Sequence, residues 1–382
     1  MYKAYKFRLY PNYEQRILLN KSFGCTRFVY NYYLSIAKEK KNMNAYSCIK
    51  DYTSKLKYQY PFLTEIDSIL IRKSIFNLND AYNNYFKLGF GYPKYKSKYN
   101  KNSYTTNAIY SSYKDKNYCN IELDLINRKV KLPKLKWVNV KGYRNIDKIN
   151  GRIISAAISK EPNGKYYVSL VYELPNLSIT NVATKSIVGI DIGVKKLITL
   201  SDGTTIDNNK YIEKYQKRIN RMNRNLSRKI KGSNNFYKYK QKLAILYSKL
   251  KNARKYYVHN ITKKITDNYD IITCEKLNTI NMIKKKNNLS KRIIDATFYE
   301  IIRQLQYKSK YKGKYFYQID TYYPSSQTCS VCGNVDNKYK ELNERKYYCS
   351  KCQSILDRDL NASINIMFEG LKLYMKNNLA NI

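Results

Sequence analysis

Hydrophobic and polar positions change their spacing several times along the 382-residue chain. Residues 2–9 alternate as in a strand, which should end before Pro11. Apolar residues then recur at the i, i+3, i+4 spacing of helices from about 12 to 90, and again over 211–268 and 291–312. Short apolar runs predict strands at 130–140, 153–159, 165–175, 269–278 and 314–323. The pattern predicts helices, then a β module, then an α/β layer structure.

The stretch SIVGIDIGVKKLITLSDG (186–203) is expected to be a buried strand with an acid inside it. Alternation places Asp191 on one face between Gly189 and Gly193, two residues without side chains. Burying an isolated carboxylate is costly and glycine weakens a strand interior, so local stability explains neither choice. Bare backbone beside the acid would make room for a cation and a phosphate. The alternative is that Asp191 caps a turn or pairs with Lys195.

A second apolar strand, YDIITCEKLN (269–278), also ends in an acid. Glu275 closes this strand immediately before a loop, where a side chain is held in place yet reaches an open edge. The alternative is a surface ion pair with Lys276.

The segment LDRDLNASINIMFEG (356–370) should supply a third acid. Its apolar positions form one helical stripe, made by Leu360, Ile364, Met367, Phe368 and Leu371. Asp357 fits the N-cap position and Asp359 the first turn, and helix capping alone would explain an acid there. Three carboxylates from two strand ends and one helix can bind two divalent cations that activate water at a phosphodiester. Hard oxygen ligands favour Mg²⁺ or Mn²⁺.

The eight cysteines fall into two groups. Four are scattered singly, namely Cys25, Cys48, Cys119 and Cys274. The others form two CxxC pairs separated by sixteen residues, namely Cys329, Cys332, Cys349 and Cys352. Two CxxC turns complete a tetrahedron around Zn²⁺, and because all four positions are filled, the zinc should be structural. The spacing also indicates a reducing compartment without disulfides.

The composition indicates a polyanionic partner. Lysine and arginine number 72 against 28 acids, a net charge of +44, and 43 tyrosines accompany them. An AT-rich genome would enrich lysine and tyrosine but does not explain the scarcity of acids, so nucleic acid is the expected partner. Tyrosines interleaved with lysines over 91–104 suit base stacking. No apolar run is long enough to span a bilayer, so we expect a soluble, unexported protein without a membrane partner.

The chain has a single histidine, His259, within a predicted helix. With one histidine in the chain, a Ser-His-Asp mechanism or a histidine-metal nuclease has little to work with. We interpret His259 as a core or RNA-contacting residue.

Taken together, these residues resemble the TnpB family, the OrfB-type proteins of insertion sequences, which are related to Fanzor proteins and type V CRISPR effectors. The match covers nearly the whole chain, and the order and spacing of its segments make it specific. These segments are YKFRLYPNYEQ (5–15), GCTRFVYN (24–31), GYPKYKSK (91–98), IVGIDIGVKKLITLSDG, IITCEKLNTINM (271–282), YYPSSQTCSVCG (322–333) and DRDLNASINI (357–366).

The resemblance implies a multidomain α+β protein. Its parts would be a helical recognition lobe, a wedge β-barrel, and a RuvC-like nuclease of RNase H type with an inserted zinc ribbon. The implied boundaries are 1–10 for the first wedge strand, 11–104 for the helical lobe, 105–182 for the wedge barrel, 183–322 for the first part of the nuclease, 323–355 for the zinc insert and 356–382 for the C-terminal part.

The resemblance also implies an activity, in which a transposon-encoded guide RNA, called omega RNA, directs cleavage of double-stranded DNA beside a short target-adjacent motif. The metal-binding acids carried over by position are Asp191, Glu275 and Asp359, because the acid of the family lies two residues before the asparagine that is Asn361 here. We place contacts with the motif or the duplex in the helical lobe and the linker, at Tyr46, Arg72, Lys73, Lys94, Lys96 and Tyr104.

Three other functions fit parts of the sequence. A guided DNA binder that represses without cleaving would be expected to lack one of the acids. A guide-free transposase or resolvase would need no discrete RNA, whereas the β module and the basic helices suggest one. A zinc-ribbon RNA-binding protein leaves Asp191 and Glu275 unexplained. The compartment depends on the host: cytoplasm or nucleoid in a prokaryote, nucleus or viral factory otherwise.

Overall fold

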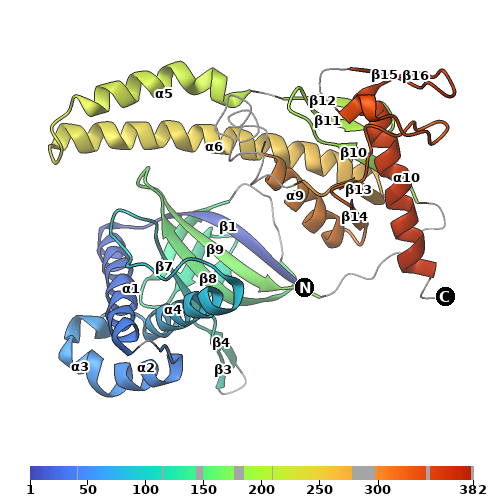
Figure 1. The fold of residues 1–382 in the computed structure, drawn as a ribbon. Helices are drawn as coiled ribbons and strands as arrows, with labels where there is room; N and C mark the ends of the chain where they lie inside the picture. The colour runs from blue at the N-terminus through green and yellow to red at the C-terminus, as the bar shows by residue number, and fades with distance from the viewer. Residues whose placement is uncertain are drawn as a thin grey trace. The chain divides into compact units, whose positions relative to one another are not determined.

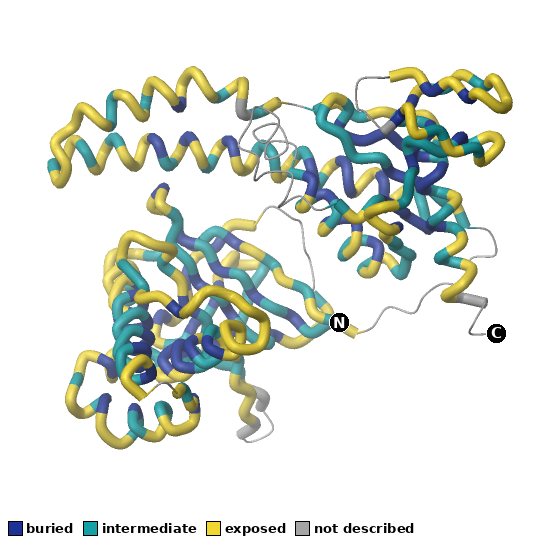
Figure 2. Tube along the Cα trace, viewed as in Figure 1, coloured by how far each residue is buried: buried dark blue, intermediate teal, exposed yellow. Residues whose placement is uncertain are grey.

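The structure is a computed structural model that describes residues 1–40, 42–113, 116–142, 149–175, 185–208, 210–277, 297–340 and 345–379. The chain divides into two compact units, Met1–Asn176 and Leu177–Ile382. Figure 1 shows the elements of each unit, and Figure 2 shows how far each residue is buried. Among the described residues, no helix has the length and apolarity to cross a membrane.

The first unit packs helices against a seven-stranded antiparallel sheet. The strands run in the order β2-β8-β9-β1-β7-β6-β5. They are β1 (Tyr2–Tyr10), β2 (Asn102–Asn107), β5 (Glu122–Asp124), β6 (Lys129–Leu132), β7 (Lys136–Lys141), β8 (Arg152–Lys160) and β9 (Tyr166–Glu173), and a separate hairpin joins β3 (Tyr110–Tyr113) to β4 (Lys116–Cys119). The N-terminal strand therefore joins the β module, as its alternation suggests. No pairing between the edge strands β2 and β5 is found in the described part, so the closure of a barrel stays a prediction.

Capping residues mark the ends of the longer helices of this unit, as α4 shows. They are α1 (Tyr13–Lys40), α2 (Ala45–Asp51), a π-helical turn (Tyr52–Leu56), α3 (Lys57–Gln59), a 3₁₀ turn (Pro61–Thr64) and α4 (Ser68–Leu88). Asp67 caps α4 by accepting a hydrogen bond from the Ile69 amide. Gly89 ends the helix in the left-handed conformation.

Helices and sheet of the first unit share one hydrophobic core. Leu34 of α1, Ile75 of α4 and Val168 of β9 are completely buried in the same cluster. Strand β2 crosses the expected boundary between residues 104 and 105. The helical segment and the β module therefore form a single compact unit, and the finer domain boundaries stay predictions.

The second unit is an α/β/α layer structure around a five-stranded sheet. The strands run in the order β12-β11-β10-β13-β14, with β10, β13 and β14 parallel. They are β10 (Ile187–Asp191), β11 (Lys196–Leu200), β12 (Thr205–Asp207), β13 (Ile271–Glu275) and β14 (Tyr315–Ile319). The helices are α5 (Tyr211–Ser227), α6 (Asn234–Asn268), α9 (Phe298–Tyr311) and α10 (Arg358–Leu379). The expected helical start at 291–296 lies outside the described residues.

Alternate side chains of β10 and β13 face opposite layers. Val188 and Ile272 pack with apolar residues of α6 and α9. On the other face, Thr273 donates a hydrogen bond to the Ile366 carbonyl of α10. Asp191 and Glu275 share this second face by strand alternation.

The predicted single strand over 186–203 is wrong in one respect. It is a hairpin, in which β10 ends at Asp191 and β11 returns antiparallel beside it. Gly193 makes the turn possible, because a Cβ there would lie 2.8 Å from the Lys196 carbonyl oxygen.

Helix α10 approaches the sheet at two glycines. A Cβ on Gly189 of β10 would lie 2.0 Å from the Ser363 carbonyl oxygen, and one on Gly370 would lie 2.0 Å from the Thr273 methyl group. No real Cβ occupies such a distance, so both positions require glycine. The predicted reason for Gly189 was wrong, because the space beside it holds the backbone of α10 and not a cation or a phosphate.

This contact predicts that Gly370→Ala destabilises the second unit by about 1–3 kcal/mol, the usual cost of overpacking a core. The matched control is Gly24→Ala within α1, where nothing lies within 4 Å of the new methyl group. The control should be neutral or stabilising by up to about 1 kcal/mol, since alanine favours a helix. Denaturant unfolding of the full chain measures both changes, and equal effects of the two substitutions would contradict the contact.

Candidate functional site

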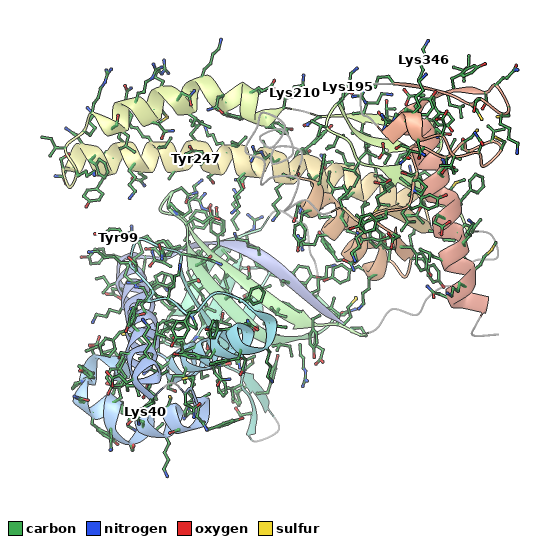
Figure 3. The ribbon with its side chains drawn as sticks, in the orientation of Figure 1. Lys40, Tyr99, Lys195, Lys210, Tyr247 and Lys346 are labelled. Carbon is green, nitrogen blue, oxygen red and sulfur yellow. The ribbon has the colours of Figure 1, made fainter. Side chains whose placement is uncertain are left out.

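Asp191 lies at the carboxyl end of β10, in the middle of the sheet. Its side chain is half-buried. Lys195 is exposed (Figure 3), and no ion pair joins it to Asp191 in the part of the chain that the structure describes. The alternative role of Asp191 as a partner of Lys195 therefore has no support.

Glu275 ends the neighbouring parallel strand. The register pairs Gly189 with Thr273 and Ile190 with Cys274, so Asp191 and Glu275 end adjacent strands at the same edge. Ser325 donates a hydrogen bond to Oε1 of Glu275. The neighbouring Lys276 is exposed, and the described ion pairs do not include one between it and Glu275.

Asp357 and Asp359 have different roles at the start of α10. Oδ1 of Asp357 accepts hydrogen bonds from the amides of Asp359 and Leu360, at 3.0 and 3.1 Å, while Oδ2 pairs with Lys196 at 3.1 Å. Asp357 is therefore the helix cap, as its position suggests. Asp359 lies in the first turn, half-buried, with Nη1 of Arg345 at 3.7 Å.

Electrostatics link the three acids. Burial and, after it, the negative charges of Glu275 and Asp359 raise the pKa of Asp191 to about 8, while Arg358 opposes the shift. Burial also raises the pKa of Glu275, against the hydrogen bond from Ser325. Carboxylates held where their ionised forms are disfavoured are suited to a cation, which would reverse the sign of the local field.

The acids are less tightly gathered than the cysteines. Within the described ranges, the one group of three or more acidic, histidine or cysteine side chains close enough to hold an ion is that of the four cysteines. A metal at the acid edge would therefore draw the carboxylates closer together. The donor set itself, made only of hard oxygens, fits Mg²⁺ or Mn²⁺.

The four cysteines form a possible zinc site. Their ligand atoms lie within 4.8 Å of one another, with 3.7 Å between the sulfurs of Cys329 and Cys352 and 3.5 Å between those of Cys332 and Cys349. A zinc tetrahedron with bonds of about 2.3 Å has edges of about 3.8 Å, so the geometry fits the metal. All eight cysteines are free of disulfides, as predicted.

Each cysteine pair lies on a tight turn. The Gly333 amide donates to the Cys329 carbonyl at 2.9 Å, and the Gln353 amide donates to the Cys349 carbonyl at 3.0 Å. Both Gly333 and Gln353 are left-handed. The short strand β15 (Lys346–Tyr348) leads into the second turn, and β16 (Ile355–Asp357), which pairs with β15, leads from that turn into α10.

Sequence reasoning missed the residues that join the cysteine module to α10. Asn361, completely buried, donates to the Thr328 carbonyl at 2.7 Å and accepts from the Ser330 amide at 2.9 Å. Asn365 donates to the carbonyls of Ser325 and Thr328 at 2.8 and 2.6 Å. The sequence feature that could have indicated them is a pair of asparagines four residues apart, a spacing that places both on one helix face.

Arg358 was also missed. It is 5% exposed, and its Nη2 donates to the Tyr339 carbonyl at 2.7 Å and to the Ser326 hydroxyl at 3.4 Å. A buried guanidinium beside the acids lowers the pKa of Asp191.

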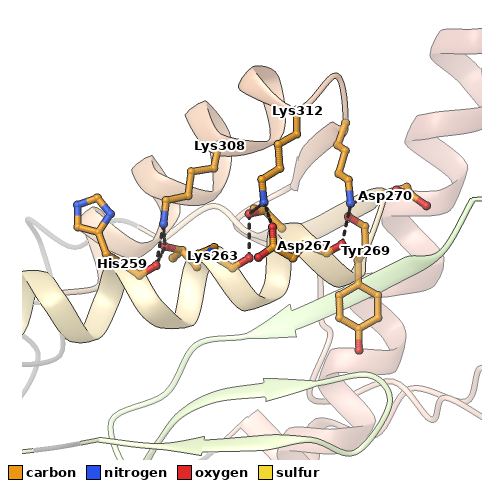
Figure 4. A network of polar contacts seen from close by, with 10 residues as sticks. His259, Lys263, Asp267, Tyr269, Asp270, Lys308 and Lys312 are labelled. Atoms are coloured by element: carbon orange, nitrogen blue, oxygen red, sulfur yellow. Dashed lines mark hydrogen bonds and ion pairs between the residues drawn. The ribbon is translucent and has the colours of Figure 1, made fainter. Parts of the chain in front are cut away.

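His259 lies within α6 and takes part in a polar network through its backbone. Lys308 of α9 donates to the His259 carbonyl at 2.9 Å and to the Thr262 hydroxyl at 2.6 Å (Figure 4). Lys312 donates to the Thr266 hydroxyl at 2.8 Å and pairs with Asp267. These bonds hold α9 against the last turns of α6. The positive charge of the lysines there also interacts favourably with the negative end of the α6 dipole.

The predicted nucleic-acid contacts divide into exposed and structural positions. Tyr46 is 77% exposed, Arg72 and Lys94 are exposed, and Lys73 is half-buried, so these four stay predictions. The predicted contact of Tyr104 with nucleic acid is wrong, because this side chain is 6% exposed and packs against Phe23 in the core.

Lys96 has a local role that the sequence did not reveal. It is half-buried, its ammonium lies 3.7 Å from the centre of the Tyr30 ring, and burial lowers its pKa to about 8. Nearby Tyr99 is 75% exposed and is labelled in Figure 3. The 91–104 segment thus offers some aromatic side chains to solvent and keeps others inside.

Three family descriptions match the chain. The family OrfB_IS605, "Probable transposase", matches residues 169–286. The "Cas12f1-like, TNB domain" matches residues 298–366, and the helix-turn-helix domain of the OrfB_IS605 group matches residues 1–43.

Similar proteins match along almost their whole length. "Putative RNA-guided DNA endonuclease InsQ" of Escherichia coli strain K12 is 30% identical, over 96% of this chain and 92% of that protein. A protein of Streptomyces pristinaespiralis with the same functional description is 30% identical, over 97% and 89%. Cas12f1 in the cryo-electron microscopy structure of a Cas12f1–sgRNA–target DNA complex shares the fold with a TM-score of 0.57 and 15% identity, over 96% of this chain and 98% of that one. The shared fold supports the predicted α+β class. The sequence matches show that the chain belongs to the TnpB family of OrfB-type proteins.

Proposed function

We propose that this protein is an RNA-guided DNA endonuclease that cleaves double-stranded DNA beside a short target-adjacent motif. The observation that carries the proposal is the electrostatic coupling of Asp191, Glu275 and Asp359, which come from two adjacent strand ends and the first turn of α10. The names of its full-length relatives support the same activity. Guide RNA and target DNA are the proposed partners, in keeping with the net charge of +44.

Asp191, Glu275 and Asp359 would hold two Mg²⁺ or Mn²⁺ ions. When bound, such ions lower the pKa of an attacking water and stabilise the leaving oxygen of a phosphodiester. The protein contributes backbone positions for the carboxylates, because two acids end neighbouring strands and the third lies in a capped helix. Arg358 would moderate the repulsion among the acids.

The target sequence would be recognised by base pairing between guide RNA and target DNA. The protein would recognise the shape of the nucleic-acid backbone and the short motif. The first unit would then provide the helical lobe and wedge barrel. Tyr46, Arg72, Lys73 and Lys94 are the side chains proposed to contact nucleic acid there. The cysteine module would hold a structural zinc ion.

Expression of the protein with its native flanking DNA tests the guided mechanism. We expect one abundant copurified RNA that ends beyond the element boundary, and cleavage of a DNA that matches its variable end in the presence of Mg²⁺. Heterogeneous host RNA would contradict guidance and favour the resolvase or RNA-binding alternatives.

Asp191→Asn should lower the cleavage rate of the guided complex at least about a thousandfold, about 4 kcal/mol in the barrier, because the metal site loses a charged ligand. Binding of guide and target, measured by filter retention, should not change. The matched control is Asp207→Asn at the exposed end of β12, which should cleave normally. A guided repressor would show no cleavage in either protein.

Asp191 also predicts a pH dependence of stability. Its pKa of about 8 in the folded protein exceeds the ordinary value of about 3.9, so folding favours its protonated form. The contribution of Asp191 to stability is therefore fully present below about pH 4 and is lost as the pH rises to about 8. In magnesium-free buffer, the Tm advantage of Asp191→Asn over wild type should widen between pH 5 and pH 8. Parallel Tm curves would contradict the shift.

The cysteine module predicts about one zinc ion per chain by elemental analysis. Cys349→Ser should lose the zinc and increase amide hydrogen exchange around both turns and the start of α10, because binding free energy is folding free energy in such modules. Cys48→Ser, which changes a half-buried cysteine of the first unit, is the control and should keep the zinc. Full zinc content in Cys349→Ser would refute the site.

A further inference from the structure

We propose that Ser325 is a positioning residue for Glu275, held in place by Asn365 of α10. The proposal rests on the proposed nuclease function, since it assigns Ser325 a role in presenting one metal-binding carboxylate. Ser325 does not itself bind the metal or the substrate in this proposal; it acts through Glu275.

The contact is direct and buried. Ser325 is 5% exposed, and its hydroxyl donates a hydrogen bond to Oε1 of Glu275. A donor on one carboxylate oxygen fixes the rotation of the carboxylate and leaves Oε2 for a cation. The bond also favours the ionised form, which is the form that binds metal.

Ser325 is placed by its backbone rather than by its hydroxyl. Asn365, 4% exposed, donates from Nδ2 to the Ser325 carbonyl at 2.8 Å and to the Thr328 carbonyl at 2.6 Å. The turn closes on itself, because the amide and the hydroxyl of Thr328 both donate to the Pro324 carbonyl, at 3.0 and 2.9 Å. The serine therefore presents its hydroxyl from a rigid turn.

The same turn reaches the other two parts of the site. Asn361, one helical turn before Asn365, also donates to the Thr328 carbonyl. Asp359 lies two residues earlier in the same helix, and Cys329 directly follows Thr328. One set of hydrogen bonds thus joins Glu275, the helix of Asp359 and the first cysteine turn, with Ser325 as its contact to Glu275.

This arrangement separates positioning from folding. Within the described residues, the Ser325 hydroxyl bonds only to Glu275, while the turn is held through the Ser325 carbonyl. Ser325→Ala keeps the carbonyl and removes the hydroxyl. Ser325→Thr keeps a hydroxyl and is the conservative rescue.

The experiment measures Mn²⁺ binding to the full-length, zinc-loaded, RNA-free chain by electron paramagnetic resonance. Mn²⁺ bound at the acid edge is measured as the difference between the binding of wild type and that of Asp191→Asn. We expect Ser325→Ala to weaken this binding about tenfold, as residues that orient metal ligands typically do, and Ser325→Thr to restore most of it. In the guided complex, the Mg²⁺ concentration for half-maximal cleavage should rise by a similar factor, with guide binding, zinc content and Tm close to wild type.

Ser330→Ala is the matched control, since it makes the same change in the same loop. Its backbone amide, not its hydroxyl, contacts Asn361, so binding should stay as in wild type. Asn365→Ala, which releases the Ser325 carbonyl, should weaken Mn²⁺ binding as well. Wild-type Mn²⁺ affinity in Ser325→Ala would overturn the proposal, as would equal weakening in Ser330→Ala. If wild type and Asp191→Asn bind equal amounts of Mn²⁺, the acids hold no metal and the proposed function itself is contradicted.

Discussion

The close contact between α10 and the sheet is the constraint on which the acid site depends. Gly189 lets the backbone of β10 touch α10 at Ser363. Asp191 lies two residues further along the strand, about 7 Å away, and Asp359 lies one turn up the helix, about 6 Å away. This backbone contact therefore brings Asp191 and Asp359 to the same end of the sheet, and a side chain at position 189 would push α10 away from β10.

Placing these acids in one partly buried region opposes stability. Burial and two neighbouring negative charges raise the pKa of Asp191, which means that the ionised site is strained without a cation. Only part of this charge is balanced within the protein, by buried Arg358 and by Arg345 at 3.7 Å from Asp359. Functional sites commonly keep such unfavourable groups, because a fully neutralised site would have no affinity left for a metal.

Much of this organisation could be predicted from residue patterns. The Asp357 cap and the paired CxxC turns depend on local spacing, which a sequence displays directly. The predicted apolar stripe of the last helix is wrong, because Phe368 is 46% exposed while Asn361 and Asn365 are buried. The hairpin after Asp191 was missed because apolar residues continue on both sides of the turn at Gly193. Gly189 was misinterpreted and Tyr104 misplaced because both depend on a tertiary neighbour, α10 in one case and Phe23 in the other. Ser325 could not be found, since its partner lies fifty residues away.

The cysteine module is too small to be stable without additional support. Its buried cluster consists of Cys329, Tyr339, Tyr347 and Cys349, with Leu356 packed beside them, and so few apolar groups seldom stabilise a fold. A metal would supply part of the missing free energy, and the buried amides of Asn361 and Asn365 supply another part by bonding the module to α10. Because α10 carries Asp359 and the turn carries Ser325, the bonds that stabilise the module also order two of the three acid positions. The module and the acid site should therefore fold as one cooperative unit.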